Sequence, residues 1–133
     1  MSHGNIERVH PVFDAYNRRE LDAALELVDP EVEFTTRFLE IEGDAHYRGH
    51  DGIREWLGDL LAVFPDFKAE VLDAREIGEI VIATVRVRGH GVGSDVPLDE
   101  RLWQASEWRD GKAVWWRTSG TEAEALEAAG LEA

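Results

Sequence analysis

The chain has 133 residues, no cysteine, and 28 acidic against 14 basic side chains, which gives a formal net charge of −14. Its length predicts one domain over residues 1–133, and the lack of cysteine excludes disulfides, thiolate catalysis and cysteine-ligated metal centres. A surface this acidic repels phosphate groups, so nucleic acid and anionic membranes are unfavourable partners.

The sequence carries no signal for targeting to a membrane or insertion into one. Residues 1–9 lack the apolar core of a signal peptide, and no apolar run approaches the roughly 20 residues that span a bilayer. We therefore expect a cytoplasmic protein. A hydrophobic fraction of 44%, with five Trp and five Phe, predicts a folded and aromatic core.

Two helices are predicted at the start of the chain. Apolar residues at helical spacing over 6–16 predict an amphipathic helix, although Pro11 interrupts the pattern and its regular part is expected nearer His10. A shorter helix is predicted over 21–28, and Pro30 ends it because proline disfavours helical geometry in the residue before it.

The hydrophobic period then changes to two over residues 32–38, which predicts a strand with one buried face. Residues 39–48 follow no regular pattern. From Ile53 to Phe64 the apolar residues again mark one side of a helix, which ends at Pro65.

The second half of the chain predicts about four strands joined by hairpins. They cover residues 67–77, 80–88, 98–109 and 112–119. Asp110-Gly111 is a strong signal for a type I′ turn, which needs positive φ at both central residues. Thr121-x-x-Glu124 is a capping box that opens a terminal helix, and Gly130 ends it. Helices on one face of a curved antiparallel sheet predict an α+β domain with a pocket at its open end.

Short segments in a fixed order along the chain carry a resemblance to a known family. They are Ala15-Tyr16-Asn17-Arg18 with Leu21-Asp22-Ala23, Val28-Asp29-Pro30-Glu31-Val32, Tyr47-Arg48-Gly49-His50-Asp51-Gly52-Ile53, Phe64-Pro65-Asp66-Phe67, Arg109-Asp110-Gly111-Lys112 and Glu124-Ala125-Leu126-Glu127-Ala128-Ala129-Gly130. With these segments the chain resembles the SnoaL-like proteins related to polyketide cyclases, within the nuclear transport factor 2-like superfamily.

The resemblance implies a cone-shaped α+β roll, of the nuclear transport factor 2-like or cystatin-like type, with helices packed on a strongly curved, mainly antiparallel sheet. It also implies a mouth between the helices and the concave sheet, and commonly a homodimer through the other sheet face. Because this fold hosts isomerases, dehydratases, cyclases, epoxide hydrolases and plain binding modules, the resemblance does not choose an activity.

Successive side chains of a strand point to opposite faces of the sheet, and this alternation predicts which residues face the cone. Gln104 and Ser106 share one face of their strand, and by resemblance to ketosteroid isomerase and limonene epoxide hydrolase Val114, Trp116 and Thr118 point inward. The expected pocket consists of Tyr16, Phe34, Thr36, Tyr47, Trp56, Gln104, Ser106, Trp116 and Thr118. Its aromatic, hydroxyl and amide groups suit a small hydrophobic molecule. The alternative is that the tryptophans simply fill the core.

The catalytic carboxylates of these relatives are not matched. In the register that the resemblance implies, Thr36 and Gln104 replace the two catalytic Asp of ketosteroid isomerase, and Thr118 replaces one Asp of limonene epoxide hydrolase. A hydroxyl cannot take the place of a carboxylate as a base near neutral pH. The remaining candidate for a general base is His46, oriented by Asp44, and the alternative is a solvated loop histidine.

Metal and cofactor motifs are missing from the sequence. His46 and His50 have the spacing of a helical metal pair, but Gly49 and its turn-like context argue against a helix there. The chain has no His-Glu-x-x-His, no glycine-rich phosphate loop with lysine, and no nucleophile elbow. We therefore expect neither a metal nor a cofactor.

The outer sheet face is predicted to combine arginines with Trp103 and Trp115. Arginine and aromatic residues are enriched at protein interfaces, so we expect a homodimer through this face. Two functions remain open. One is a cofactor-independent acid/base enzyme of the isomerase, cyclase or hydratase type that acts on a hydrophobic substrate in the cone. The other is a non-catalytic ligand-binding or dimerisation module of the same fold.

Overall fold

The structure is a computed structural model that describes residues 4–36, 45–91 and 97–131. In these ranges the chain forms four helices and six strands. They are α1 (Gly4–Asn17), α2 (Leu21–Leu25), β1 (Val28–Thr36), β2 (Ala45–Arg48), α3 (Gly49–Val63), β3 (Lys68–Ile77), β4 (Ile80–His90), β5 (Pro97–Arg109), β6 (Lys112–Ser119) and α4 (Glu122–Ala128). None of these helices is long and apolar enough to cross a membrane.

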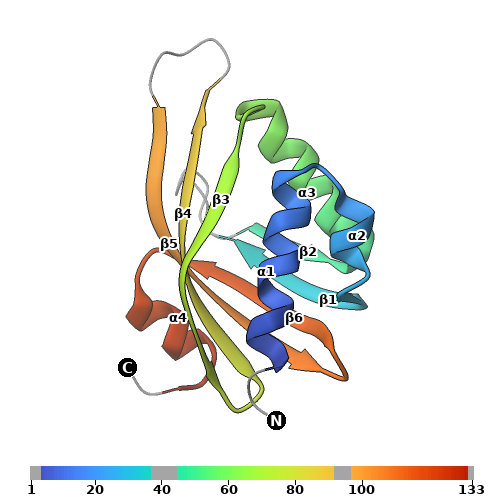
Figure 1. The fold of residues 1–133 in the computed structure, drawn as a ribbon, viewed down its shortest axis with the longest axis vertical. Helices are drawn as coiled ribbons and strands as arrows, with labels where there is room; N and C mark the ends of the chain where they lie inside the picture. Colours follow the sequence, from blue (N-terminus) through green and yellow to red (C-terminus); the bar gives the residue numbers. More distant parts are fainter. Residues whose placement is uncertain (1–3, 37–44, 92–96, 132–133) are drawn as a thin grey trace.

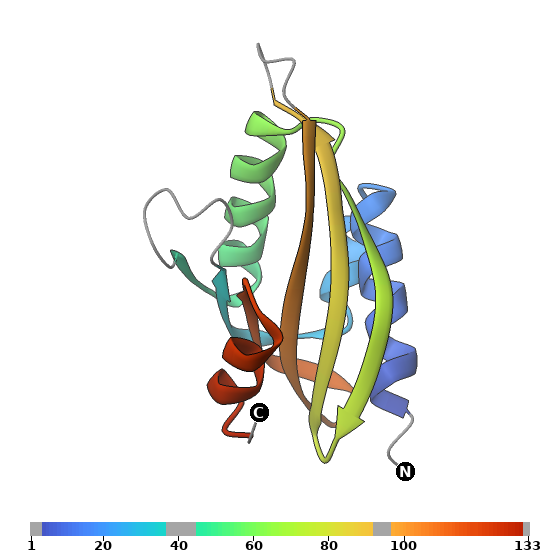
Figure 2. The same ribbon diagram turned by 90° about the vertical axis from the view of Figure 1, so that its left-hand side faces the viewer.

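The six strands form one sheet in the order β2-β1-β6-β5-β4-β3. The β1–β6 pair is parallel, and the other neighbours are antiparallel. The sheet is strongly curved, with α1, α2 and α3 on its concave side and α4 on its outer side (Figures 1 and 2). This confirms the predicted α+β architecture of helices on a curved, mainly antiparallel sheet.

The main core lies between the concave face and the first three helices. Trp108 is 1% exposed, and its ring lies 6.0 Å from that of Trp116, which in turn lies 6.0 Å from the ring of Phe13 on α1. A smaller core lies on the outer face, where α4 packs its buried residues against Ile82 and Ala105. The concave face therefore carries the larger of the two cores, in which aromatic rings pack among aliphatic side chains.

Local signals in the sequence gave correct turns and caps. Asp110 and Gly111 have φ values of 52° and 80°, as a type I′ turn between β5 and β6 requires. The Thr121 hydroxyl accepts a hydrogen bond of 3.1 Å from the backbone N–H of Glu124, which confirms the N-cap of α4.

Helix boundaries differ from the sequence pattern. α1 begins at Gly4 and continues through Pro11, which is exposed, so the missing backbone hydrogen bond lies on the solvent side of the helix. α2 ends at Leu25, shorter than predicted, and α3 begins at Gly49 instead of Ile53. Hydrophobic spacing detects the packed part of a helix but not its polar first turn.

Strand β1 begins four residues earlier than predicted, and β2 lies inside the stretch expected to be irregular. Val28 pairs with Ala113 of β6, and a further backbone bond of 2.9 Å joins Ala113 N to Leu27 O. β2 forms by antiparallel pairing with β1, from Glu33 opposite Arg48 onward. Both differences come from hydrogen bonds between distant segments, which a local period does not reveal.

A β-bulge between β5 and β6 corrects the predicted face of Val114. Glu107 pairs with Trp115 and Trp108 pairs with Ala113, so Val114 is the extra residue. Ala113 is fully buried in the main core, as is the inward-facing Trp116, whereas Val114 is half-buried on the outer side near α4. The expected inward trio is thus reduced to two residues.

Candidate functional site

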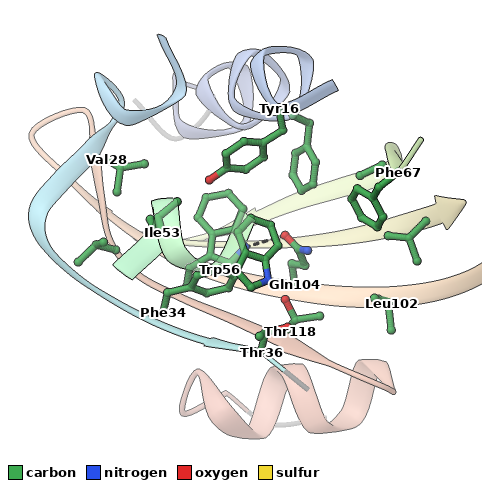
Figure 3. Close-up of a pocket in the computed structure, with 15 residues that line it drawn as sticks. Tyr16, Val28, Phe34, Thr36, Ile53, Trp56, Phe67, Leu102, Gln104 and Thr118 are labelled. Atoms are coloured by element: carbon green, nitrogen blue, oxygen red, sulfur yellow. Dashed lines mark hydrogen bonds between the residues drawn. The ribbon is translucent and has the colours of Figure 1, made fainter. Parts of the chain in front are cut away.

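A cavity lies between the first three helices and the concave face of the sheet, and 15 residues line it (Figure 3). Counted out to its partly open mouth, its empty volume is about 600 Å³. Only about 30 Å³ of this space is wide enough for the centre of a water molecule. The cavity is therefore narrow, and side chains must move for a larger molecule to enter.

Three polar side chains cross the sheet side by side in this otherwise apolar cavity, and we call them the polar row: Gln104, Thr118 and Thr36. Gln104 on β5 is the direct cross-strand partner of Thr118 on β6. Thr36 lies beside Thr118 on the neighbouring strand β1 (Figure 3). The two threonines are 5% and 3% exposed. Alternation brings these residues to the concave face because they share strand parity with the core residues.

Trp116 forms a hydrogen bond with Gln104, the residue at one end of the polar row. Its indole Nε1 donates a hydrogen bond of 2.6 Å to Oε1 of Gln104. A separate bond of 2.9 Å runs from Nε1 of Trp108 to the hydroxyl of Ser106, behind the cavity wall. Both buried indoles therefore have acceptors, which removes the cost of burying their N–H groups.

The opposite side of the cavity is aromatic and comes from two helices. Trp56 on α3 lies edge-to-face against Tyr16 of α1, with ring centroids 5.7 Å apart, and against Phe34 of β1 at 4.8 Å. Such contacts add to the energy of burial. Trp56 is half-buried, as are Tyr16 and Gln104, so the cavity wall is not sealed at these side chains.

Tyr16 contributes a protonated phenol. Burial raises the pKa of Tyr16 well above its ordinary value, so the hydroxyl stays neutral and able to donate a hydrogen bond at physiological pH. It forms no hydrogen bond with the residues that the structure describes. The pKa of Tyr47 is also raised, first by burial and then by the carboxylates of Asp59 and Glu55.

Seven of the nine residues expected in the pocket line the cavity. They are Tyr16, Phe34, Thr36, Trp56, Gln104, Trp116 and Thr118. Tyr47 does not line it, because its ring packs against the ring of Phe34 at 6.0 Å near the sheet edge. Ser106 has the correct strand parity but does not line the cavity either; its buried hydroxyl accepts the bond from Trp108, and its cross-strand partner is Trp116.

The candidate base His46 lies on the other face of the sheet. It is exposed, and its Nδ1 is hydrogen-bonded at 3.0 Å to the hydroxyl of Thr35, which faces away from the cavity. Its proposed orienting partner Asp44 lies outside the described residues. His46 is therefore not placed to take a proton from a molecule in the cone.

His50 has a structural role. It lies in the first turn of α3, where helix was not expected, and its Nε2 donates a bond of 2.7 Å to the carbonyl of Val28. This bond ties α3 to the start of β1. Within the described residues no group of three or more histidine, aspartate or glutamate side chains could hold a metal ion.

Several apolar lining residues were not expected from the sequence. Examples are Phe13, Ile53, Phe67, Val87 and Leu102. Leu102 shares strand parity with Gln104, and Val87 faces inward on β4, so alternation contained the signal for both. None of the 15 lining residues in the described part of the chain is charged, although the protein as a whole is strongly acidic.

Solved structures with the same arrangement share the fold at low sequence identity. A protein described as a SnoaL-like polyketide cyclase from Jannaschia has a TM-score of 0.76 at 19% identity, over 96% of this chain and 92% of that one. TerC, co-crystallised with polyporic acid, has a TM-score of 0.78 at 19% identity, over 91% and 94%. A hypothetical protein from Catenulispora acidiphila with a ketosteroid isomerase-like fold, in complex with trimethylamine, has a TM-score of 0.76 at 18% identity, over 94% and 93%.

The comparison with curated proteins gives no significant match. The family model for the SnoaL-like domain, in contrast, matches residues 9–123, which include the whole cavity wall. The chain belongs to the SnoaL-like domain family.

Proposed function

We propose that this protein binds a flat, largely apolar small molecule in its cone. The observation that carries the proposal is the composition of the cavity wall, which has aromatic rings on the helix side and a short polar row on the sheet side. Apolar walls with a few polar groups that fix orientation are typical of small-molecule sites.

Two solved structures of the same fold were obtained with a small molecule, which supports a small-molecule ligand for this chain. One was co-crystallised with polyporic acid and another was solved in complex with trimethylamine. At 19% and 18% identity they share the fold with this chain, so the ligand class proposed here rests on the cavity wall of this chain.

Binding can be tested with fluorene, a flat apolar probe, in a tryptophan fluorescence titration. Trp116→Ala removes a wall of the cone, and its neighbour Trp115→Ala is the matched control, since Trp115 faces the outer side near α4. We expect Trp116→Ala to weaken binding by about tenfold or more, because a buried aromatic contact of this size is lost. Circular dichroism of both variants establishes that they are folded. Equal affinities in the two variants would contradict the proposal.

A second candidate function is cofactor-independent turnover of the bound molecule, of the isomerase, cyclase or hydratase type. Tyr16 favours it, because a phenol that stays protonated can donate to a carbonyl oxygen on which negative charge develops. The lining residues that the structure describes include no carboxylate or imidazole, which favours simple binding instead.

The variant Tyr16→Phe distinguishes an enzyme from a ligand-binding module, because only an enzyme converts the bound molecule. Mass spectrometry of flat ketones incubated with the protein would detect conversion. If turnover is the function, Tyr16→Phe loses conversion while His46→Ala, which changes a side chain outside the cone, keeps it. Binding without conversion in the wild-type protein would identify the site as a ligand-binding module.

A further inference from the structure

The hydrogen bond between Trp116 and Gln104 determines how the Gln104 amide is turned. An indole N–H can only donate, so the atom that receives it at 2.6 Å must be the amide oxygen. The other half of the amide is an NH₂ group with two donors. Because its oxygen is already engaged, Gln104 offers hydrogen-bond donors to its surroundings.

The rest of the polar row has unused hydrogen-bonding capacity. The hydroxyls of Thr36 and Thr118 form no hydrogen bond with described residues, although both side chains are almost fully buried. In the described part of the chain, Oε2 of Glu76 is the one sealed side-chain polar atom without a partner. The threonine hydroxyls are therefore reachable from the cavity, where a ligand or water can satisfy them.

The charge of the surroundings restricts which ligand groups can form hydrogen bonds with the polar row. Among the lining residues that the structure describes, none carries a positive charge, and the formal net charge of the protein is −14. A carboxylate or phosphate group would lose its hydration there without gaining a cation. A neutral acceptor, such as a carbonyl oxygen, can accept from the amide NH₂ and from a threonine hydroxyl without that cost.

We propose that Trp116 and Gln104 make the cone selective for neutral flat molecules with a carbonyl oxygen over hydrocarbons of the same shape. Gln104 is the specificity-determining residue, and Trp116 is a positioning residue that keeps the amide NH₂ available. This inference rests on the proposed function, because it concerns the ligand class of the same cavity.

The test compares fluorenone with fluorene, two flat molecules that differ by one carbonyl oxygen. The quantity measured is the ratio of their dissociation constants, by fluorescence titration corrected for absorbance, in wild type and variants. Gln104→Met replaces the amide by an apolar side chain of similar length. Comparing ratios between variants cancels the greater hydrophobicity of fluorene.

We expect the preference for fluorenone to fall by about 3- to 10-fold in Gln104→Met, the range expected for one net hydrogen bond. Trp116→Phe frees the amide to rotate and lowers the same ratio. The double variant Gln104→Met/Trp116→Phe shows no further fall, and it also avoids leaving the indole N–H without an acceptor. Trp115→Phe, on the outer face, keeps the wild-type ratio.

Two outcomes separate this inference from the function on which it rests. If both probes bind and Gln104→Met leaves the ratio within about twofold of wild type, the acceptor selectivity is wrong and the binding function stands. If neither probe binds the wild-type protein up to its solubility limit, both proposals are overturned.

Discussion

Trp116 and Gln104 lie on adjacent strands and are joined by a 2.6 Å hydrogen bond from the indole Nε1 to the amide Oε1. The bond lies in the wall of the apolar cavity on the concave face. The indole of Trp116 therefore has two roles. Its ring packs against the rings of Phe13 and Trp108, and its N–H orients the amide of Gln104.

The contribution of this hydrogen bond to the stability of the protein can be measured by a double-mutant cycle. Trp116→Phe leaves Oε1 of Gln104 without its donor, and Gln104→Met leaves the indole N–H without its acceptor, so each is expected to cost about 1–3 kcal/mol. The double variant should recover about 1 kcal/mol relative to the sum. Urea unfolding of the four proteins gives the coupling energy, and a value near zero would show that the bond does not contribute.

Trp108 should be the most costly tryptophan to truncate. It is 1% exposed and its indole also bonds to Ser106, so Trp108→Ala is expected to lower the free energy of unfolding by about 3–5 kcal/mol. Trp103→Ala, which changes a half-buried residue beside α4, should cost less. Denaturant unfolding followed by circular dichroism compares the two, and equal losses would contradict the placement of the main core on the concave face.

Asp66 ties the segment after α3 to the end of β4, and its pKa should depend on His90. Its two oxygens accept hydrogen bonds of 2.8 Å from the backbone N–H and from Nδ1 of His90. These bonds, the side-chain bond foremost, lower the pKa of Asp66 below its ordinary value. The stability that they provide is therefore present above the ordinary carboxyl pKa and is lost as pH falls through the lowered pKa.

The variant His90→Ala should raise the pKa of Asp66 towards its ordinary value, although the backbone N–H bond remains. NMR titration of the side-chain carboxyl carbons measures this shift. Asp99 is an internal control, because its pKa is lowered by a separate partner, the guanidinium of Arg86. A change at Asp99 equal to that at Asp66 would mean that the variant acts through the whole fold.

We also expect a homodimer through the outer sheet face, although α4 already covers Trp103 and Trp115. The face that remains open includes Thr84 and Arg101 on neighbouring strands. Thr84→Arg places bulk and charge there and should shift the protein to monomer, whereas Ala62→Arg on the exposed side of α3 should not. Size-exclusion chromatography with light scattering reports the mass, and a wild-type monomer at micromolar concentration would exclude the dimer.

Sequence patterns predicted the site best where strands have a regular alternation. The period of two grouped Trp116 with Thr118 and put Gln104 on the less charged face of its strand, whereas the family resemblance implied that the face of Trp116 and Thr118 points inward. Strand alternation predicts on which face of the sheet a side chain lies, but not whether that side chain reaches the cavity. Ser106 shows the difference, because it has the correct parity and is buried, yet its hydroxyl is bonded to Trp108 and it does not line the cavity.

By itself the sequence determined the α+β class and the aromatic core, which follow from hydrophobic periods and composition. It also determined the Asp110-Gly111 turn and the cap at Thr121, which depend on residues that are neighbours along the chain. The tertiary structure decided the parallel pairing of β1 with β6, the bulge at Val114, and the turning of His46 away from the cone. Each of these depends on hydrogen bonds and packing between segments far apart in the chain, and no local period of hydrophobicity records which distant segment becomes the partner.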